Sequence, residues 1–391
     1  MVARYRGKLS VVKRPLDRRS RGARGLRIPW GQVALFRAHR HWLNRRAPRG
    51  AMLRVAGEIC GLHAQVLSSA ELSLWARVDH LAPAAVQRAL WSEGSLVKTW
   101  AIRGTLHLLP RAELPLFFGA LSTYTHFLRQ GWFKYFNVTR EELEEVIAAL
   151  AQTLPGRTLT REELAAEVAQ RTGSSKYGTV LRQSWGVMLK PAAFRGQLCF
   201  AQSDGQRVRF THPGAVELWG GPRALRELAR RYLAAYGPAT RQDFAAWWGE
   251  SAAQAETLLD SLDTVMVEVD GTRAFLLKRD AQLALGSRSS GEVRLLPAFD
   301  PYVIGAPRRG GLFPVAQKRR IFRGQGWISA TLVVDGRIEG VWRQERQGRR
   351  LTLTVEPFAR PSASVRSGAS AEAEKLAVFL GCTLQKISWT V

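Results

Sequence analysis

The stretch of residues 61–110 constrains the fold most, because it fixes an order of parts that composition alone does not produce. A helix is predicted to end at His63-Ala64-Gln65, and two further helical patterns follow it. A strand pair comes next, over residues 96–102 and 105–109, joined by the turn Arg103-Gly104. Helices followed by a two-stranded wing are the layout of a winged-helix DNA-binding module.

The same succession of helices and a wing recurs twice downstream. The second wing is predicted at the turn Asp204-Gly205 and the third at Asp270-Gly271. After about residue 281, short alternating strands with turns at Asp335-Gly336 and Gly348 replace this pattern. We therefore predict an α+β fold with three tandem winged-helix modules followed by a small C-terminal β-barrel-like domain. The predicted parts are a basic flexible arm (1–29), module 1 (30–111), a helical linker (112–156), module 2 (157–215), module 3 (222–278) and the β-rich domain (282–391).

The charge of the chain indicates a polyanionic partner. Its 391 residues include 58 Lys and Arg against 32 Asp and Glu, a formal net charge of +26. Charge of this size on an aromatic-rich chain is typical of nucleic-acid-binding proteins. The alternative is the compositional bias of a GC-rich genome, which raises the arginine content everywhere.

Several classes of protein are excluded by what the sequence lacks. No run approaches ~20 apolar residues, so we expect no membrane helix, and no apolar segment near the N-terminus indicates a signal peptide. The three cysteines form no CxxC pair, which argues against a disulfide framework or a zinc ribbon. Phosphate-binding glycine motifs and the nucleophile elbow are absent. We expect a cytoplasmic protein that needs no metal or other cofactor.

The residues resemble a known family, the winged-helix DNA glycosylases of the AlkZ/YcaQ type. The family pattern has Gln-x-Gln at the position of His63-Ala64-Gln65, with RGTLHL downstream; LLPAFDPY and GWIS also match, so the resemblance covers about residues 30–391. It implies a monofunctional enzyme, acting as a monomer, that hydrolyses the N-glycosidic bond of alkylated purines in double-stranded DNA. Such lesions include N7-alkylpurines and bulky or crosslinked adducts, met in base excision repair or in self-resistance. This chain departs from the pattern, because its first motif residue is a His.

The resemblance assigns the chemistry to His63 and Gln65, which would hold a water against the sugar C1′ of the damaged nucleotide. An N7-alkylated purine carries a positive charge and leaves readily, so the site needs a placed water more than a strong acid. Gln can orient the water, whereas His can also accept its proton. In an extended segment the two side chains share a side. A structural role near a helix end is the alternative.

Glu58 is a third candidate for the catalytic site. It lies seven residues before Gln65 and shares its face if the helix continues. A carboxylate there would orient His63 or stabilise the sugar cation, and a solvated helix acid is the alternative.

Basic residues elsewhere are predicted to contact DNA. Lys98 and Arg103 lie on the first wing, where cations position the phosphate backbone. The densest internal basic cluster surrounds Gly310-Gly311 and suits a DNA clamp, with a solvated loop as the alternative. Its members are Arg308, Arg309, Lys318, Arg319, Arg320 and Arg323. The family that this chain resembles probes the duplex with a hairpin of its C-terminal domain. Residues 334–337, which include Arg337, are one candidate for this hairpin. The basic arm is either a DNA-tracking tail or a solvated extension.

Two functions of different class remain open at this point. The first is the DNA glycosylase, favoured by the motif, the charge and the tandem wings. The second is a non-catalytic winged-helix DNA-binding regulator or architectural protein, which the His at the first motif position keeps open. A regulator of this length usually carries a ligand-binding or dimerisation domain, and the sequence shows no coiled-coil pattern.

Overall fold

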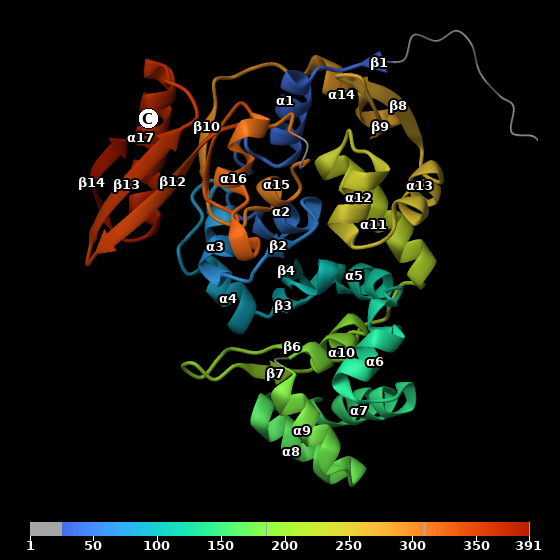
Figure 1. The fold of residues 1–391 in the computed structure, drawn as a ribbon. Coiled ribbons are helices and arrows are strands. Elements are labelled where there is room, and N and C mark those ends of the chain that lie inside the picture. Colours follow the sequence, from blue (N-terminus) through green and yellow to red (C-terminus); the bar gives the residue numbers. More distant parts are fainter. Residues whose placement is uncertain (1–25, 185, 308–309, 391) are drawn as a thin grey trace, which may run out of the picture.

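The computed structural model describes residues 26–184, 186–307 and 310–390 (Figure 1). The predicted arm lies outside the described residues except for positions 26–29, and so do Arg308 and Arg309 of the predicted clamp. The short strand β1 (Leu26–Arg27) pairs in parallel with the third wing.

Residues 30–110 contain helices followed by a two-stranded hairpin, together with the unpredicted strand β2. After α1 (Trp30–Arg40) come α2 (Met52–Glu58), β2 (Leu62–His63), α3 (Leu67–Trp75), α4 (Ala85–Trp91), β3 (Leu96–Trp100), the turn η1 (Ile102–Gly104) and β4 (Leu106–Pro110). The strands form one antiparallel sheet in the order β2-β4-β3.

The prediction that a helix ends at the His63 motif is wrong. Helix α2 ends at Glu58, and His63 lies on strand β2. Cys60, with φ 63°, and Gly61, with φ 87°, adopt left-handed conformations that a right-handed helix does not contain. This break turns the chain into the sheet and puts the motif on an extended segment.

A helical region connects the first wing to the next. It contains η2 (Arg111–Glu113), α5 (Leu114–Leu121), η3 (His126–Leu128), α6 (Gln130–Phe136) and α7 (Arg140–Thr153). Helix α7 begins at a capping box, in which Thr139 and Glu142 each bond the other's backbone N–H.

The second and third regions again place paired strands after helices. The second contains β5 (Thr158–Thr160), α8 (Arg161–Thr172), α9 (Ser175–Gln183), η4 (Val187–Leu189), α10 (Lys190–Phe194), β6 (Cys199–Phe200) and β7 (Arg209–Thr211). The third contains α11 (Gly221–Tyr236), α12 (Arg241–Trp248), α13 (Ala252–Asp260), β8 (Thr264–Val269) and β9 (Thr272–Leu277). One hydrophobic core runs from Cys60 to Leu277 through all three regions, so their division into separate winged-helix modules stays a prediction.

The C-terminal part is a mixed sheet with a helix against it. Its elements are η5 (Lys278–Asp280), α14 (Ala281–Gly286), β10 (Val293–Leu296), α15 (Pro301–Ile304), η6 (Val315–Gln317), α16 (Lys318–Ile321), η7 (Gly324–Gly326), β11 (Thr331–Val334), β12 (Arg337–Gln347), β13 (Arg350–Pro357), α17 (Ala363–Phe379) and β14 (Thr383–Trp389). The five strands lie in the order β10-β11-β12-β13-β14.

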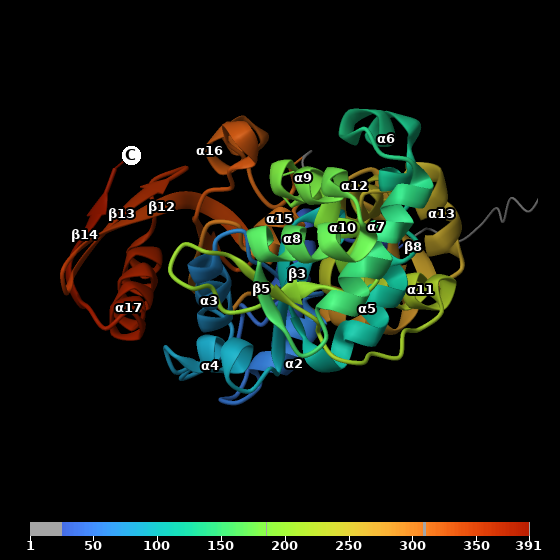
Figure 2. The same ribbon diagram turned by 90° about the horizontal axis from the view of Figure 1, so that it is seen from below.

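The prediction of a barrel-like domain is wrong for the described residues, because this sheet is open. Strand β14 returns through the crossover helix α17 and therefore runs parallel to β13, at the edge of the sheet. Helix α17 packs beside the strands (Figure 2), where Ala373 and Leu376 share a core with Leu351 and Leu353. The face of the sheet that a closed barrel would bury inside is thus covered by α17.

Candidate active site

His63 lies on β2, an edge strand of the first sheet, opposite a second histidine on the central strand β4. In the register of β2 and β4 it pairs with His107, and the two ring centroids are 5.6 Å apart. His107 is buried, with its Nδ1 2.9 Å from the carbonyl oxygen of Thr105. Burial, together with the neighbouring His63, lowers the pKa of His107 to about 3. His107 is therefore neutral at physiological pH.

The other face of the His63 ring is covered by Phe299 from the C-terminal domain. The two rings are stacked, with centroids 5.3 Å apart and an interplanar angle of 14°. Trp327 meets Phe299 edge to face at 4.9 Å and is 46% exposed. An aromatic wall thus borders the site, and one of its rings is open to solvent.

A buried ion pair holds this wall in place. Phe299 has a φ of 58°, which is uncommon for a residue with a side chain. The next residue, Asp300, is fully buried, caps α15 and accepts both guanidinium bonds of Arg77, at 2.7 and 2.8 Å. Arg77 belongs to the first module, so the pair fastens the LLPAFDPY segment to the sheet that carries His63.

The environment keeps His63 uncharged. Burial, and after it the charge of Arg103, lowers the pKa of His63 to about 4. The side chain is 9% exposed, and its Nδ1 has no hydrogen-bond partner among the described residues. A neutral imidazole can accept the proton of a water that reaches one of its ring nitrogens, and Nδ1 is itself buried here.

Gln65 follows His63 by two residues, in the bend after β2, and is exposed. The N–H of Ala64 donates to the carbonyl of Leu106 at 2.7 Å, so the chain remains paired beyond the end of β2. Side chains two residues apart in an extended segment share a side. His63 is nearly buried and Gln65 is exposed, an arrangement that suits a water between them.

Glu58 is not where the sequence placed it. Its carboxylate accepts a hydrogen bond from Trp42 Nε1 at 2.7 Å and lines a cleft to which His63 does not contribute. The break after α2 carries His63 away from the face of Glu58. In this structure Glu58 therefore does not orient His63.

The two wing cations make contacts inside the protein. Arg103 adopts φ 56° in the wing turn, and its Nη1 donates to the carbonyls of Trp247, at 2.7 Å, and Ala246, at 3.4 Å, at the end of α12. Lys98 lies over the ring of Phe200, facing the second wing. Arg103 thus ties the first wing to the third region, next to His63.

The basic cluster around α16 divides into free and paired members. Lys318, Arg319 and Arg323 are exposed, in the same segment as the exposed Trp327. Arg320 pairs with Glu356 at 3.3 Å instead. The backbone N–H of Arg323 donates to the carbonyl of Trp327 at 2.8 Å, so this cation lies next to the exposed ring, whereas Lys318 and Arg319 lie on α16.

The hairpin at residues 334–337, predicted as the probe, is held within the fold. A Cβ on Gly336 would overlap the carbonyl of Ala34 in α1, and the Gly336 carbonyl accepts from the buried Tyr302 hydroxyl at 2.5 Å. Arg337 donates to Glu339 and to the carbonyl of Gly311. This hairpin is packed against α1, which argues against its reaching a duplex, and the role of Arg337 stays a prediction.

A different hairpin projects from the sheet. Strands β12 and β13 extend past the core, so that every residue from 343 to 350 is exposed, and Figure 1 shows the strands reaching beyond α17. Arg346 and Arg349 flank the turn at Gly348. The sequence analysis missed these two arginines, although the long alternating run before Gly348 was a usable signal. It also missed Phe299 and Trp327 as site residues.

Among the described residues, no three His, Cys, Asp or Glu side chains gather where they could hold a metal ion. In the same part of the chain, no helix combines the length and apolar character needed to cross a bilayer.

Comparison with known proteins gives three concordant matches. A family model described as "DNA glycosylase AlkZ-like" matches residues 56–379. The chain is 33% identical over 345 residues to an interstrand DNA cross-link repair glycosylase of Streptomyces sahachiroi, covering 85% of this chain and 91% of the relative. A solved structure, the Streptomyces sahachiroi DNA glycosylase AlkZ, superimposes with a TM-score of 0.83 at 30% identity, over 93% of this chain and all of that one.

Proposed function

The chain belongs to the family of AlkZ-like DNA glycosylases, and we propose that it hydrolyses the N-glycosidic bond of N7-alkylated purines in double-stranded DNA, including bulky or crosslinked adducts. The relative named for interstrand cross-link repair supports the inclusion of crosslinks. The observation that carries the proposal is the neutral, nearly buried His63 beside the exposed Gln65.

In the proposed reaction the C1′–N9 bond breaks first, and its electron pair leaves with the base. The alkylated purine already carries a positive charge, so it departs as a neutral base without a proton from the enzyme. Gln65 and His63 hold the water whose oxygen then bonds C1′, and the water proton passes to a ring nitrogen of His63 before release to solvent. Because water and not a protein amine attacks, the enzyme is monofunctional.

A weak base suits this order of events. With a pKa of about 4, His63 is neutral at pH 7 but accepts a proton poorly from an unreacted water. The proton becomes acidic once the oxygen bonds to the cationic sugar, which is when a weak base suffices. Arg103 contributes by disfavouring the charged imidazole.

We place the duplex along the side that carries the aromatic wall. The free cations Lys318, Arg319 and Arg323 lie in the segment that leads to Trp327, and the β12–β13 hairpin presents Arg346 and Arg349. Such contacts position the phosphate backbone without reading sequence. Arg103 and Lys98 would then act by holding the wings together, and the protein would work as a monomer in the cytoplasm.

The test is the release of free base. Purified protein is incubated with duplex DNA containing N7-methylguanine, or DNA treated with a bifunctional mustard, and the released purines are measured by chromatography. Release above the spontaneous rate by the wild type, but not by Gln65→Ala, supports the proposal. No release from any adduct, with DNA binding retained, would favour the non-catalytic DNA-binding protein.

A further inference from the structure

A second basic cleft lies away from the His63 site. Its volume is about 1380 Å³, and neither His63, Gln65, Phe299 nor Trp327 lines it. It is formed by the segment after α1, by α2 and α11, and by parts of β10 and α17. In Figure 2, α2 lies on one side of the molecule and α16, next to Trp327, on the opposite side. The cleft is therefore separate from the proposed duplex face.

The lining of this cleft is strongly positive. Ten Arg and Lys side chains face four carboxylates, Glu58, Asp79, Glu113 and Glu292. Three of the carboxylates already have partners, because Glu113 pairs with Arg231, Glu292 pairs with Arg294, and Glu58 accepts from Trp42. Carboxylates outside the lining, Asp280, Glu227 and Glu372, pair with further cations of the cleft. Among the described residues, the cations left without an ion pair and available to an anionic ligand are Arg45, Arg49 and Arg54.

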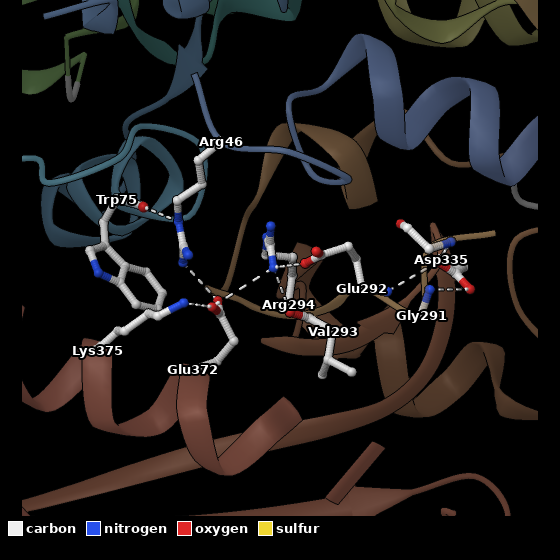
Figure 3. Close-up of polar contacts among 10 residues, drawn as sticks. Arg46, Trp75, Gly291, Glu292, Val293, Arg294, Asp335, Glu372 and Lys375 are labelled. Carbon is white, nitrogen blue, oxygen red and sulfur yellow. Dashed lines mark hydrogen bonds and ion pairs between the residues drawn. The ribbon is translucent and has the colours of Figure 1, made fainter. Parts of the chain in front are cut away.

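A buried carboxylate organises one wall of the cleft (Figure 3). Glu372, 2% exposed, lies 2.8 Å from Arg46, 3.5 Å from Lys375 and 3.8 Å from Arg294. One negative charge thus fixes three positive ones, and Arg46 is further held by the carbonyl and the ring of Trp75. Arg294 is nearly buried, and its Nε has no hydrogen-bond partner among the described residues. Prearranged cations of this kind bind an anion without the entropy cost of ordering them.

The opposite wall offers free cations and an aromatic surface. Arg45, Arg49 and Arg54 are exposed, and no ion pair involves them in the described part of the chain. Arg54 lies over the Trp42 ring at 5.0 Å, while Glu58 fixes the indole through its N–H. Exposed guanidinium planes and indole rings are the groups on which unpaired bases stack.

We propose that this cleft binds a single-stranded nucleic-acid segment, with the arginines on its phosphodiester backbone and a base against Trp42. The volume exceeds the range of about 300–1,000 Å³ typical of small-molecule pockets, which favours a polymer over a lone nucleotide or phosphate ion. A basic groove with a stacking ring is the arrangement used for unpaired strands. The site would let the enzyme hold a second nucleic-acid segment while its other face engages a duplex.

The first experiment asks whether the two sites are independent. Full-length protein is saturated with an unlabelled hairpin duplex and titrated with a fluorescein-labelled oligothymidine of about 12 nucleotides, followed by anisotropy. The labelled strand should still bind, giving a ternary complex. If saturating duplex abolishes binding of the strand, the cleft is not a separate site and the proposal is wrong.

The second experiment locates the strand. The triple variant Arg45→Ala/Arg49→Ala/Arg54→Ala should lower the affinity for oligothymidine more than tenfold and reduce the log–log salt slope by about 2, as expected for three lost phosphate contacts on a single strand. Base release from damaged duplex should stay unchanged, because none of these residues belongs to the His63 site. The matched control Arg273→Ala/Arg288→Ala/Arg360→Ala removes three exposed arginines elsewhere. If both triple variants lose the same affinity for oligothymidine, the loss is explained by net charge alone and the proposal is wrong.

Two further experiments identify the ligand and use only the wild-type protein. Inorganic tripolyphosphate should compete weakly, and affinity should rise with strand length; equal competition or no length dependence would assign the cleft to a small polyanion instead. An oligothymidine carrying 4-thiothymidine should photocrosslink to the peptide that contains Trp42 and Arg54. Crosslinks confined to the His63 face would contradict the proposal.

Discussion

Among single residues, the proposed reaction depends most on the protonation state of His63. The base form of His63 exists above its pKa of about 4 and is lost as the pH falls through that value. We therefore expect single-turnover release of N7-methylguanine to be constant between about pH 5.5 and 8 and to fall near pH 4, after subtraction of the enzyme-free rate. The His63→Gln variant should still release base, and its rate should not fall near pH 4. An unchanged profile in this variant would mean that His63 only positions water.

Arg103 provides a second prediction at this scale. Burial is the larger cause of the low pKa of His63 and the charge of Arg103 the smaller one, so removing the charge should raise this pKa part of the way back. Arg103→Gln should move the acid limb of the rate profile to higher pH. Arg103→Lys keeps the charge while losing the paired bonds to α12, and its limb should stay in place. Equal shifts in both variants would show that the bonds to α12, and not the charge, act on His63.

The motif residues could be predicted from sequence because they are neighbours in the chain. Their surroundings could not, since Phe299 and Arg103 reach His63 from segments distant in sequence. A pKa shift caused by burial depends on that packing, which explains why the sequence indicated an ordinary His.

At the scale of elements, the Arg77–Asp300 pair joins the first module to the segment that carries Phe299. Asp300→Asn leaves Arg77 as an unmatched buried cation, which costs about 3–5 kcal/mol. We expect a large drop in melting temperature, and partial recovery in Arg77→Met/Asp300→Leu, where both charges are removed. Thermal unfolding followed by circular dichroism measures both effects. If the Asp300→Asn variant melts at the same temperature as the wild type, the pair does not hold these elements together.

The hairpins illustrate what a local pattern can and cannot predict. Turn signals located both the 334–337 turn and the Gly348 turn. Which of them is exposed depends on α1, since Gly336 packs on Ala34, while the β12–β13 tip is bordered only by the start of β14 among the described residues and stays exposed. Turn chemistry fixes a hairpin, whereas tertiary contacts decide whether it is free.

The exposed β12–β13 hairpin carries the second prediction about elements. Arg346→Ala/Arg349→Ala should weaken binding to undamaged duplex and reduce the log–log salt slope by about 2, at about 0.9 for each phosphate contact. Arg320→Ala/Arg337→Ala, which removes two arginines paired within the protein, is the control and should leave the slope unchanged. Equal slopes in the wild type and the hairpin variant would place the hairpin outside the DNA interface.

At the scale of the whole molecule, the sequence indicated the family and the order of helices and wings, but not how the parts merge. One core runs through the first three regions, and the C-terminal sheet shares a second core with α1 and α3. The barrel prediction failed because strand patterns do not say whether β14 closes on β10 or lies at the edge. The packing of the crossover helix α17 places β14 at the edge of the sheet, and strand periodicity does not report this packing.

The central claim is that His63 and Gln65 together activate a water for base excision. Its most direct test is single-turnover release of N7-methylguanine from duplex DNA by the wild type and by Gln65→Ala, with duplex affinity measured on the same preparations. A group that acts on the transition state should lower the rate by 10²-fold or more, on the order expected for positioning of the nucleophile, and change the affinity little. Full activity of Gln65→Ala would contradict the account, because the motif would then have no part in the chemistry.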